Sequence, residues 1–489
     1  MTAPDEVNEI VRAGLAAAPV LEGLGRQRRA ALLDRAADAL TDAGAAIVAT
    51  ADRETGLGEG RLSQELTRTC YQLQFFGEVV REGSYLEVTI DLPASTPIGP
   101  RPDLRRMLVP LGPVAVFGAS NFPLAFSVPG GDTASALAAG CPVVAKVHPA
   151  HPDTSRLCWS TMRDAVVAHG LPAGTLGLVD GLRAGAALVV HPAIKAVGFT
   201  GSTAGGRALQ EIAGTRPESI PFFGELGSLN PLVVTPGAAS ERAEEIARGF
   251  VGSMTLGTGQ FCTKPGLLFV PSGADGWRLR RALADAVRQV PAGEMLTTPI
   301  QEAFEGEITR RRADARLTLL GEAAPVERAP RRAAAAVFGV VASDLHDDLL
   351  DETFGPTALV VEYADPDQLV TTLGRISGQL TATLHASHDE TDLVARLHDV
   401  LRARAGRLVF DGYPTGVAVS WAMHHGGPDP ATTSIGHTSV GAASIRRWLR
   451  PISYQNAPAD VLPPELRDEN PAGVPRRVNG VMQPNPTGS

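Results

Sequence analysis

The middle of the chain alternates short apolar runs with helix-like segments, and this alternation restricts the fold more than any other feature. From residue 111 the runs GPVAVFGA, PVVAKVHPA, GTLGLVDG and IKAVGFTGS have the length of buried strands, and segments with helical spacing separate them. Consecutive parallel strands need such long connections. We therefore expect an α/β fold with a Rossmann-type sheet over residues 111–225, whose ligands bind at the carboxyl ends of the strands. The second crossover helix is expected to begin at an N-cap formed by Asp153 or Thr154.

The regions on either side of this sheet differ in character. Residues 1–85 predict helices, because apolar residues recur there at three-and-four spacing between charges. Residues 86–110 alternate and contain prolines, which predicts a β hairpin or protruding arm. A second αβ region follows over 226–439, and a proline-rich tail covers 440–489.

Composition limits the kind of protein. The chain has 489 residues, of which 44% are hydrophobic and 20% charged, as in a globular protein with more than one domain. A net charge of -9 gives no sign of a nucleic-acid or membrane partner. The four cysteines are scattered without a CxxC pair, which favours free thiols over a disulfide framework or a metal site. Because no secretory signal or transmembrane-length run is visible, we expect a cytoplasmic location.

No stretch matches the GxGxxG fingerprint of dinucleotide-binding sheets. The segment GLGRQRR at Gly23 to Arg29 lacks the third glycine and lies in a helical context, so it is rejected. The segment GFTGSTAGGRAL instead places Gly201 and Ser202 between a strand and a helix, where free N–H groups and the helix dipole favour an anion. On this stretch alone, a plain strand-to-helix turn is an equally good interpretation.

The loop GTGQFCTKPG contains Cys262 between glycines. It also contains Lys264, one of only three lysines among 44 basic residues. A lone cysteine is usually a small buried hydrophobe, but a glycine-flanked loop also suits a nucleophile. Lys264 either lowers the pKa of the thiol or attracts an anion, or else points to solvent, and both alternatives stay open.

Six motifs together resemble one family. VFGASNFPLAF, VVAKVHPAHP, GFTGSTAGG, FFGELGSLNP, GQFCTKPG and DETFGPT follow one another over residues 117–356 in the order found in aldehyde dehydrogenases. GASNFP, KVHPAHP, CTKPG, FDGYPTGVAVSWAMHHGGPDPATT and RRWLRPISYQ are most similar to α-ketoglutaric semialdehyde (2,5-dioxopentanoate) dehydrogenases within that superfamily.

The resemblance implies an aldehyde dehydrogenase-like α/β fold. Residues 1–85 would be the helical part of the cofactor-binding domain, 111–225 its Rossmann-type sheet, and 226–439 the αβ catalytic domain. The small β arm at 86–110 and the segment at 440–489 would mediate oligomerisation, giving a homodimer or homotetramer.

The resemblance also assigns the catalytic groups. Aldehyde oxidation by hydride transfer needs a tetrahedral alkoxide carbon, which a cysteine thiolate supplies as a thiohemiacetal before a thioester is formed. Cys262 matches that nucleophile. Glu225 matches the base that activates water for thioester hydrolysis. The Asn121 side-chain amide and the backbone N–H of Cys262 would hold the oxyanion.

The cofactor contacts follow from the same resemblance. Lys146 is similar to the lysine that reaches the adenine ribose, and Gly201 with Ser202 to the pyrophosphate contact. Glu352 resembles the carboxylate on the nicotinamide ribose, and Phe354 the ring beside the nicotinamide. No metal is implied.

Pro149 bears on the choice of cofactor. It stands three residues after Lys146, where NAD-preferring relatives often carry a glutamate, so repulsion of a 2′-phosphate is absent. His148, His151 and Arg156 are candidates for positive contacts. NADP is favoured, and NAD is possible.

The preferred hypothesis is NAD(P)-dependent oxidation of 2,5-dioxopentanoate to 2-oxoglutarate. Oxidation of long-chain or other aliphatic aldehydes is an alternative; a dicarboxylate product needs a cationic pocket, whereas a fatty substrate needs an apolar tunnel. A cysteine hydrolase pairing Cys262 with a histidine is less favoured, because no histidine lies in a recognisable Cys/His signature. A non-catalytic binding protein on the same fold is a further alternative.

Overall fold

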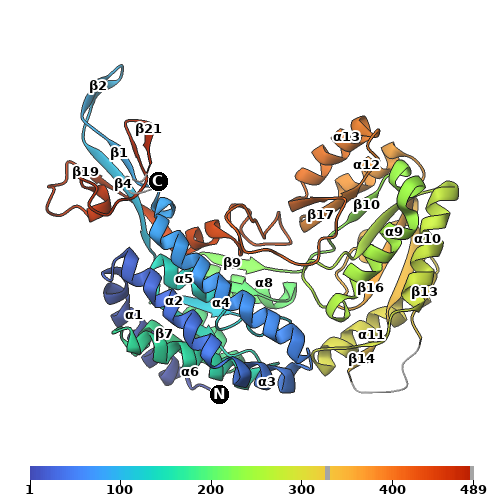
Figure 1. The fold of residues 1–489 in the computed structure, drawn as a ribbon, viewed down its shortest axis with the longest axis horizontal. Helices are drawn as coiled ribbons and strands as arrows, with labels where there is room; N and C mark the ends of the chain where they lie inside the picture. Colours follow the sequence, from blue (N-terminus) through green and yellow to red (C-terminus); the bar gives the residue numbers. More distant parts are fainter. Residues whose placement is uncertain (325–330, 485–489) are drawn as a thin grey trace.

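The computed structural model describes residues 1–324 and 331–484 (Figure 1). An N-terminal lobe of helices around one sheet faces a second lobe built on another sheet, and a slender β arm projects from the first lobe. Within the described residues, no helix combines the length and the apolar character needed to cross a membrane.

Four helices precede the arm, as the spacing of apolar residues predicts. They are α1 (Pro4–Glu22), α2 (Arg26–Asp42), α3 (Gly44–Thr55) and α4 (Glu59–Glu82). Helices α2 and α4 pack against each other through fully buried side chains such as Leu33 and Leu73. Helix α4 ends at Gly83, whose positive φ of 87° suits glycine at a helix C-terminus. The chain then turns toward the arm.

The first sheet confirms the predicted Rossmann-type alternation. Its strands are all parallel, in the order β7-β6-β5-β8-β9. They are β5 (Val114–Phe117), β6 (Val143–Lys146), β7 (Leu176–Val179), β8 (Ala196–Thr200) and β9 (Phe222–Glu225). The connecting helices are α5 (Gly131–Ala139), α6 (Pro152–Ala168), α7 (Leu182–Val190) and α8 (Thr203–Gly214). The strand order reverses between β5 and β8, which is where ligands bind in such sheets.

The predicted N-cap of α6 is wrong. The cap position is His151, and Asp153 and Thr154 lie within the first turn. Glu54, at the end of α3, accepts hydrogen bonds from their backbone N–H groups at 2.8 and 2.9 Å. A carboxylate from another helix therefore does the capping, and local sequence could not reveal it.

The second sheet has the order β13-β15-β16-β11-β10-β17-β18 and is parallel except for the pair β13–β15. Its strands are β10 (Leu232–Val234), β11 (Leu267–Pro271), β13 (Thr318–Glu322), β15 (Ala336–Val341), β16 (Thr357–Tyr363), β17 (Gln379–His385) and β18 (Ala405–Phe410). The helices are α9 (Pro236–Thr255), α10 (Gly273–Arg288), α11 (Thr298–Ala313), α12 (Pro366–Arg375) and α13 (Thr391–Arg402). A short ladder joins β12 (Gly293–Glu294) to β14 (Arg332–Ala333).

The predicted arm and the C-terminal tail form one sheet. Its order is β19-β4-β1-β20-β21, so the tail supplies both of its edges. These strands are β1 (Thr89–Asp91), β4 (Leu104–Pro110), β19 (Leu449–Gln455), β20 (Arg476–Val478) and β21 (Val481–Gln483). A separate hairpin of β2 (Ala94–Thr96) and β3 (Gly99–Arg101) extends from it to the tip of the arm (Figure 1).

Candidate active site

A cavity of about 220 Å³ lies where the ends of strands from both sheets meet. All of the residues predicted for catalysis and cofactor binding line it except Lys146; they are Asn121, Gly201, Ser202, Glu225, Cys262, Glu352 and Phe354. Lys146 ends β6, the neighbouring strand, and its nearest opposing charge is Asp180. The fold thus brings five of the six sequence motifs to one cavity.

Cys262 lies on the loop between α9 and β11. The preceding turn, Leu256–Gly259, contains the left-handed residues Gly257, Thr258 and Gly259. The Asn230 amide Nδ2 donates to the carbonyl oxygens of Cys262 at 2.8 Å and Lys264 at 2.9 Å. Asn230 is completely buried, so it fixes the loop on both sides of the thiol. Sequence reasoning missed Asn230, although it stands in the motif FFGELGSLNP.

His425 is a second residue that the sequence analysis missed. Its Nε2 lies 3.6 Å from the Cys262 sulfur, within hydrogen-bonding distance for sulfur. Burial lowers the pKa of His425 to about 3, and the charges of Arg407 and Arg68 add to this effect. The imidazole is therefore neutral at physiological pH and has one ring nitrogen that can accept a proton. Its signal in the sequence is the segment MHHGGPDP, part of a motif that supports the family resemblance but implies no role for the histidine.

The resting thiol of Cys262 is protonated. Burial, together with the negative charges of Glu352 and Glu225, raises its pKa to about 12, and Arg407 opposes the shift. Because the thiolate is the nucleophile, the site needs a group that takes up the proton when the thiol reacts.

Glu225, at the end of β9, is almost completely buried. Its Oε2 finds no hydrogen-bond partner within residues 1–324 and 331–484. Burial raises the pKa of its carboxyl well above the ordinary value, while Arg447 opposes and Asp132 adds to the shift. A carboxyl held this way is suited to exchanging a proton near neutral pH.

Asn121 lies against the loop that carries the thiol. Its Nδ2 donates to the Gln260 carbonyl oxygen at 2.9 Å. The backbone N–H of Cys262 lies against the sulfur of the same residue and lowers the pKa of that thiol. Asn121 and Cys262 line the same cavity, and their role as oxyanion donors stays a prediction.

Lys264 does not point to solvent. It is almost completely buried, and its Nζ donates to the carbonyl oxygens of Thr353 at 2.8 Å and Thr357 at 2.9 Å. Burial lowers the pKa of Lys264 to about 8. Lys264 thus ties the thiol loop to the segment that carries Glu352 and Phe354.

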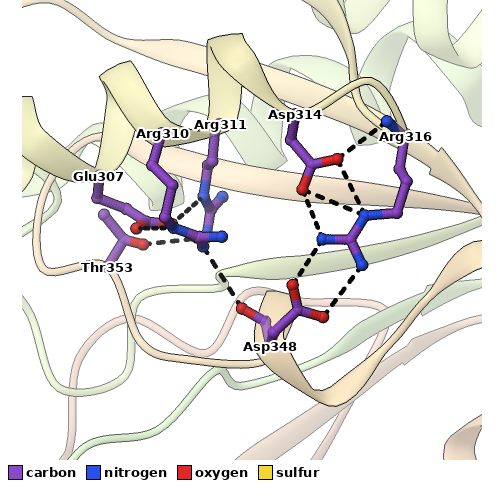
Figure 2. A network of polar contacts seen from close by, with 7 residues as sticks. All are labelled: Glu307, Arg310, Arg311, Asp314, Arg316, Asp348 and Thr353. Atoms are coloured by element: carbon purple, nitrogen blue, oxygen red, sulfur yellow. Dashed lines mark hydrogen bonds and ion pairs between the residues drawn. The ribbon is translucent and has the colours of Figure 1, made fainter.

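Helix α11 holds that same segment from the other side (Figure 2). Arg311 Nη2 donates to Thr353 Oγ1 at 3.0 Å, and Arg311 Nε donates to Glu307 at 2.8 Å. Nearby, Arg316 pairs with Asp348 at 2.5 Å. The polar network fixes the start and the end of the loop that presents Glu352.

The groups predicted for the cofactor are chemically suited to it. Ser202 is the N-cap of α8, and its Oγ accepts from the Gly205 N–H at 3.3 Å. Gly201 and Ser202 thus place a helix N-terminus at the cavity, which suits a pyrophosphate. Glu352, whose pKa burial raises to about 7, supplies a carboxylate for ribose hydroxyls. These donors and acceptors fit a nicotinamide dinucleotide.

Two of the side chains expected to offer a positive charge near Pro149, His148 and His151, are neutral. Burial lowers the pKa of His148 to about 3 and also lowers that of His151. His151 points inward, with Nε2 3.0 Å from the Ala119 carbonyl oxygen. Arg156 pairs with Asp153 at 3.0 Å and with Asp180 at 2.6 Å.

A dinucleotide-type parallel sheet and a partly buried thiol on a loop of the second lobe face one cavity, an arrangement typical of an aldehyde-oxidising dehydrogenase. The chain belongs to the aldehyde dehydrogenase family, whose family model matches residues 1–428. It is accordingly an oxidoreductase that acts on aldehydes with NAD(P), and the predicted resemblance and fold are confirmed.

Two curated relatives are similar along nearly the whole chain. Alpha-ketoglutaric semialdehyde dehydrogenase 2 of Azospirillum brasilense is 48% identical over 92% of this chain and 87% of that protein. Alpha-ketoglutaric semialdehyde dehydrogenase of Acinetobacter baylyi is 41% identical over 98% of this chain and 92% of that protein.

Solved structures have the same fold. Aldehyde dehydrogenase 21 from Physcomitrella patens, in complex with succinate, superposes with a TM-score of 0.79 at 19% identity, over 94% of this chain and 92% of that chain. Proline utilization A of Bradyrhizobium japonicum gives 0.78 at 25% identity, where 93% of this chain spans 45% of that longer protein.

Proposed function

We propose that this enzyme oxidises 2,5-dioxopentanoate to 2-oxoglutarate, with NADP as the preferred cofactor. The observation that carries the substrate assignment is the near full-length similarity to two α-ketoglutaric semialdehyde dehydrogenases. The site has the groups that the reaction needs, because a partly buried thiol, a neutral imidazole and a protonatable carboxyl surround one cavity. The runner-up substrate class, uncharged aliphatic aldehydes, is treated in the tests below.

In the first step, Cys262 Sγ bonds to the aldehyde carbon while His425 Nε2 accepts the thiol proton. The Asn121 amide and the Cys262 backbone N–H stabilise the resulting oxyanion, a role in which one donor is typically worth about 10²–10³ in rate. A bound nicotinamide would supply the hydride acceptor for oxidation of the thiohemiacetal. Glu352 would bind the ribose of that cofactor, and Phe354 would lie beside its nicotinamide ring.

In the second step, Glu225 takes a proton from a water molecule that attacks the thioester carbonyl carbon. The carbon–sulfur bond breaks, the product leaves as a carboxylate, and the sulfur regains a proton. Glu225 is suited to this role because burial raises the pKa of its carboxyl well above the ordinary value, which makes it a stronger base.

The preference for NADP rests on the absence of a carboxylate at position 149 and on Lys146 at the end of β6. Because His148 and His151 are neutral, Lys146 supplies the charge for a 2′-phosphate. Replacing Pro149 with glutamate should raise the KM for NADP at least tenfold and change the KM for NAD little. An equal change for both cofactors would overturn this assignment.

The hydrolase alternative now has a cysteine and a histidine in contact. The family assignment nevertheless explains what a hydrolase would not, namely the helix N-terminus of α8 and the Glu352 loop at the same cavity. We therefore assign the Cys262–His425 pair to the dehydrogenase mechanism.

We also propose a homodimer or homotetramer. Strands β18 and β19 each form the open edge of a sheet, and open edges with free backbone groups invite pairing with another strand. Light scattering on the purified protein measures the state directly, and a monomer at working concentrations would exclude the proposal.

We place the enzyme in the cytoplasm. All four cysteines, Cys70, Cys141, Cys158 and Cys262, are free thiols, and free thiols persist in a reducing compartment. Fractionation of the source cells followed by immunoblotting would test the location.

The first experiment follows reduced-nicotinamide absorbance with 2,5-dioxopentanoate and with hexanal, using NADP and NAD separately. Wild type should reduce NADP rapidly with the dioxo acid, and Cys262→Ser should abolish the signal. Turnover of hexanal without turnover of the dioxo acid would support the aldehyde-oxidising mechanism and contradict the substrate assignment.

A further inference from the structure

Two arginines of α4 lie against phenylalanine rings that line the cavity. Arg61 and Arg68 are seven positions apart, which places them on the same helix face two turns apart. The Arg68 guanidinium carbon lies 5.0 Å from the centre of the Phe126 ring, and that of Arg61 lies 5.2 Å from the centre of Phe122. Both phenylalanines line the cavity together with the thiol.

Neither guanidinium has an ion-pair partner in the part of the chain that the structure describes. Arg68 makes only long hydrogen bonds, at 3.3 Å to Gln72 Oε1 and 3.3 Å to the Val417 carbonyl oxygen. Arg61 Nη2 donates to the Asn121 carbonyl oxygen at 2.7 Å, whereas its Nη1 is buried and donates to no described atom. Elsewhere many arginines pair with a carboxylate. Among the described residues Arg61 and Arg68 do not, so their positive charges are available to bind an anion.

The only acidic side chain between them does not satisfy them. Glu65 is buried, and its Oε1 accepts the backbone N–H groups of Leu124 and Ala125 at 2.8 and 2.9 Å. Burial raises the pKa of its carboxyl, which further weakens it as a counter-ion. Within the described part of the chain, Arg61 and Arg68 face at most one negative charge, that of Glu65, so the region has a net positive charge. Removing a cation from water without a partner has a free-energy cost.

The positive charge of Arg68 acts on the reacting groups Cys262 and His425. The Cys262 thiolate raises the pKa of Arg68 against the larger lowering effect of burial, and Arg68 in turn lowers the pKa of His425. Arg407 on β18 acts on the same two residues, but its Nη1 and Nη2 donate to the Gly416 and Pro414 carbonyl oxygens. Of these two arginines, Arg68 has the donors that are less engaged.

We propose that Arg68, supported by Arg61, binds the carboxylate of the substrate at the end remote from the aldehyde and so selects oxo-acid aldehydes over uncharged ones. This inference rests on the proposed function. In extended 2,5-dioxopentanoate the carboxylate carbon lies four bonds, or about 5 Å, from the aldehyde carbon. A substrate bonded to Cys262 therefore extends its carboxylate along the wall formed by Phe122 and Phe126. Arginine suits this role because its planar fork binds a carboxylate through two parallel hydrogen bonds.

The test compares 2,5-dioxopentanoate with pentanal, an uncharged aldehyde of the same chain length, in wild type, Arg68→Gln and Arg68→Lys. Arg68→Gln should lower kcat/KM for the dioxo acid by about 10- to 100-fold, the range expected for a hydrogen bond to a charged group. Its kcat/KM for pentanal should change less than threefold. Arg68→Lys should retain part of the selectivity, because the charge remains and the fork is lost. Arg61→Gln should have a smaller effect in the same direction.

Arg81→Gln is the matched control, since Arg81 is on the same helix and pairs with Asp34 away from the cavity. It should leave the ratio of the two substrates unchanged. An equal loss for both substrates in Arg68→Gln would mean that Arg68 only supports the wall, and the inference would fail.

Failure of the proposed function has a different signature. If wild type does not oxidise 2,5-dioxopentanoate, the same variants are compared on 4-oxobutanoate and butanal. Selective loss of 4-oxobutanoate oxidation in Arg68→Gln would support the role of Arg68 in binding a carboxylate, although 2,5-dioxopentanoate would not be the substrate. Oxidation of uncharged aldehydes alone by wild type would overturn both.

Discussion

The Cys262 sulfur and the His425 Nε2 lie 3.6 Å apart although 163 positions separate the two residues in the sequence. Neither residue is a reactive group by itself, because burial keeps the thiol protonated and the imidazole neutral. Together they form a donor and an acceptor, so the proton of the thiol has somewhere to go when the sulfur attacks.

Replacing His425 with asparagine should lower kcat/KM by about 10²–10³, in the range for loss of a positioned proton acceptor. The residual activity should rise with hydroxide concentration, because solvent then removes the proton. Steady-state rates from pH 6 to 10 measure both effects. His424→Asn is the matched control, since His424 does not contact the sulfur; an equal loss in both variants would contradict the role of His425.

Alkylation of the free enzyme should depend steeply on pH. Burial raises the pKa of the Cys262 thiol to about 12, so the thiolate fraction increases tenfold per pH unit below that value. The rate of reaction with iodoacetamide, followed at Cys262 by mass spectrometry, should rise through pH 7 to 10 without levelling. A plateau at or below pH 8 would show that the thiol is activated before substrate binds.

Glu225→Gln should raise the melting temperature, and the increase should grow with pH. The pKa of the Glu225 carboxyl is raised in the folded state above its unfolded value, which is about 4.3. Below that pH both forms are neutral and the variant gains nothing. As the pH rises through the folded-state pKa, wild type loses stability because the buried carboxyl must ionise, and the variant does not.

Thermal unfolding between pH 4 and 8 measures this difference. Glu469→Gln serves as the control, because Glu469 is exposed. A destabilised Glu225→Gln variant at pH 8 would show that the charged carboxylate is held favourably in the folded protein.

Lys264→Met should weaken both folding and cofactor binding. The change leaves the Thr353 and Thr357 carbonyl oxygens without their buried donor, at a cost of about 2 kcal/mol in the free energy of unfolding. Because the Glu352 loop loses one of its two supports, the KM for NADP should rise while the KM for aldehyde changes less.

Denaturant titration and steady-state kinetics provide the two readouts. Lys195→Met is the matched control, since Lys195 pairs with the exposed Glu218 and should contribute less than about 1 kcal/mol. Similar effects of the two substitutions would refute the bridging role of Lys264.

The sequence by itself determined the elements and the chemistry. Buried parallel strands are continuous apolar runs, so β5 to β8 were found where the pattern placed them. The ordered motifs identified the family, and Glu225 lies at the cavity because its motif ends strand β9 there. The division into domains and the roles of the individual site residues stay predictions.

Only the tertiary structure decided which side chains meet. It turned Lys264 inward to Thr353, placed His425 on the thiol, capped α6 with Glu54, and joined the tail to the arm. It also placed the Arg68 guanidinium against the ring of Phe126. A local pattern records whether a residue is buried and how the backbone turns, because these depend on near neighbours. Contacts across the fold depend on how distant segments pack, and that information is absent from any short stretch of the chain.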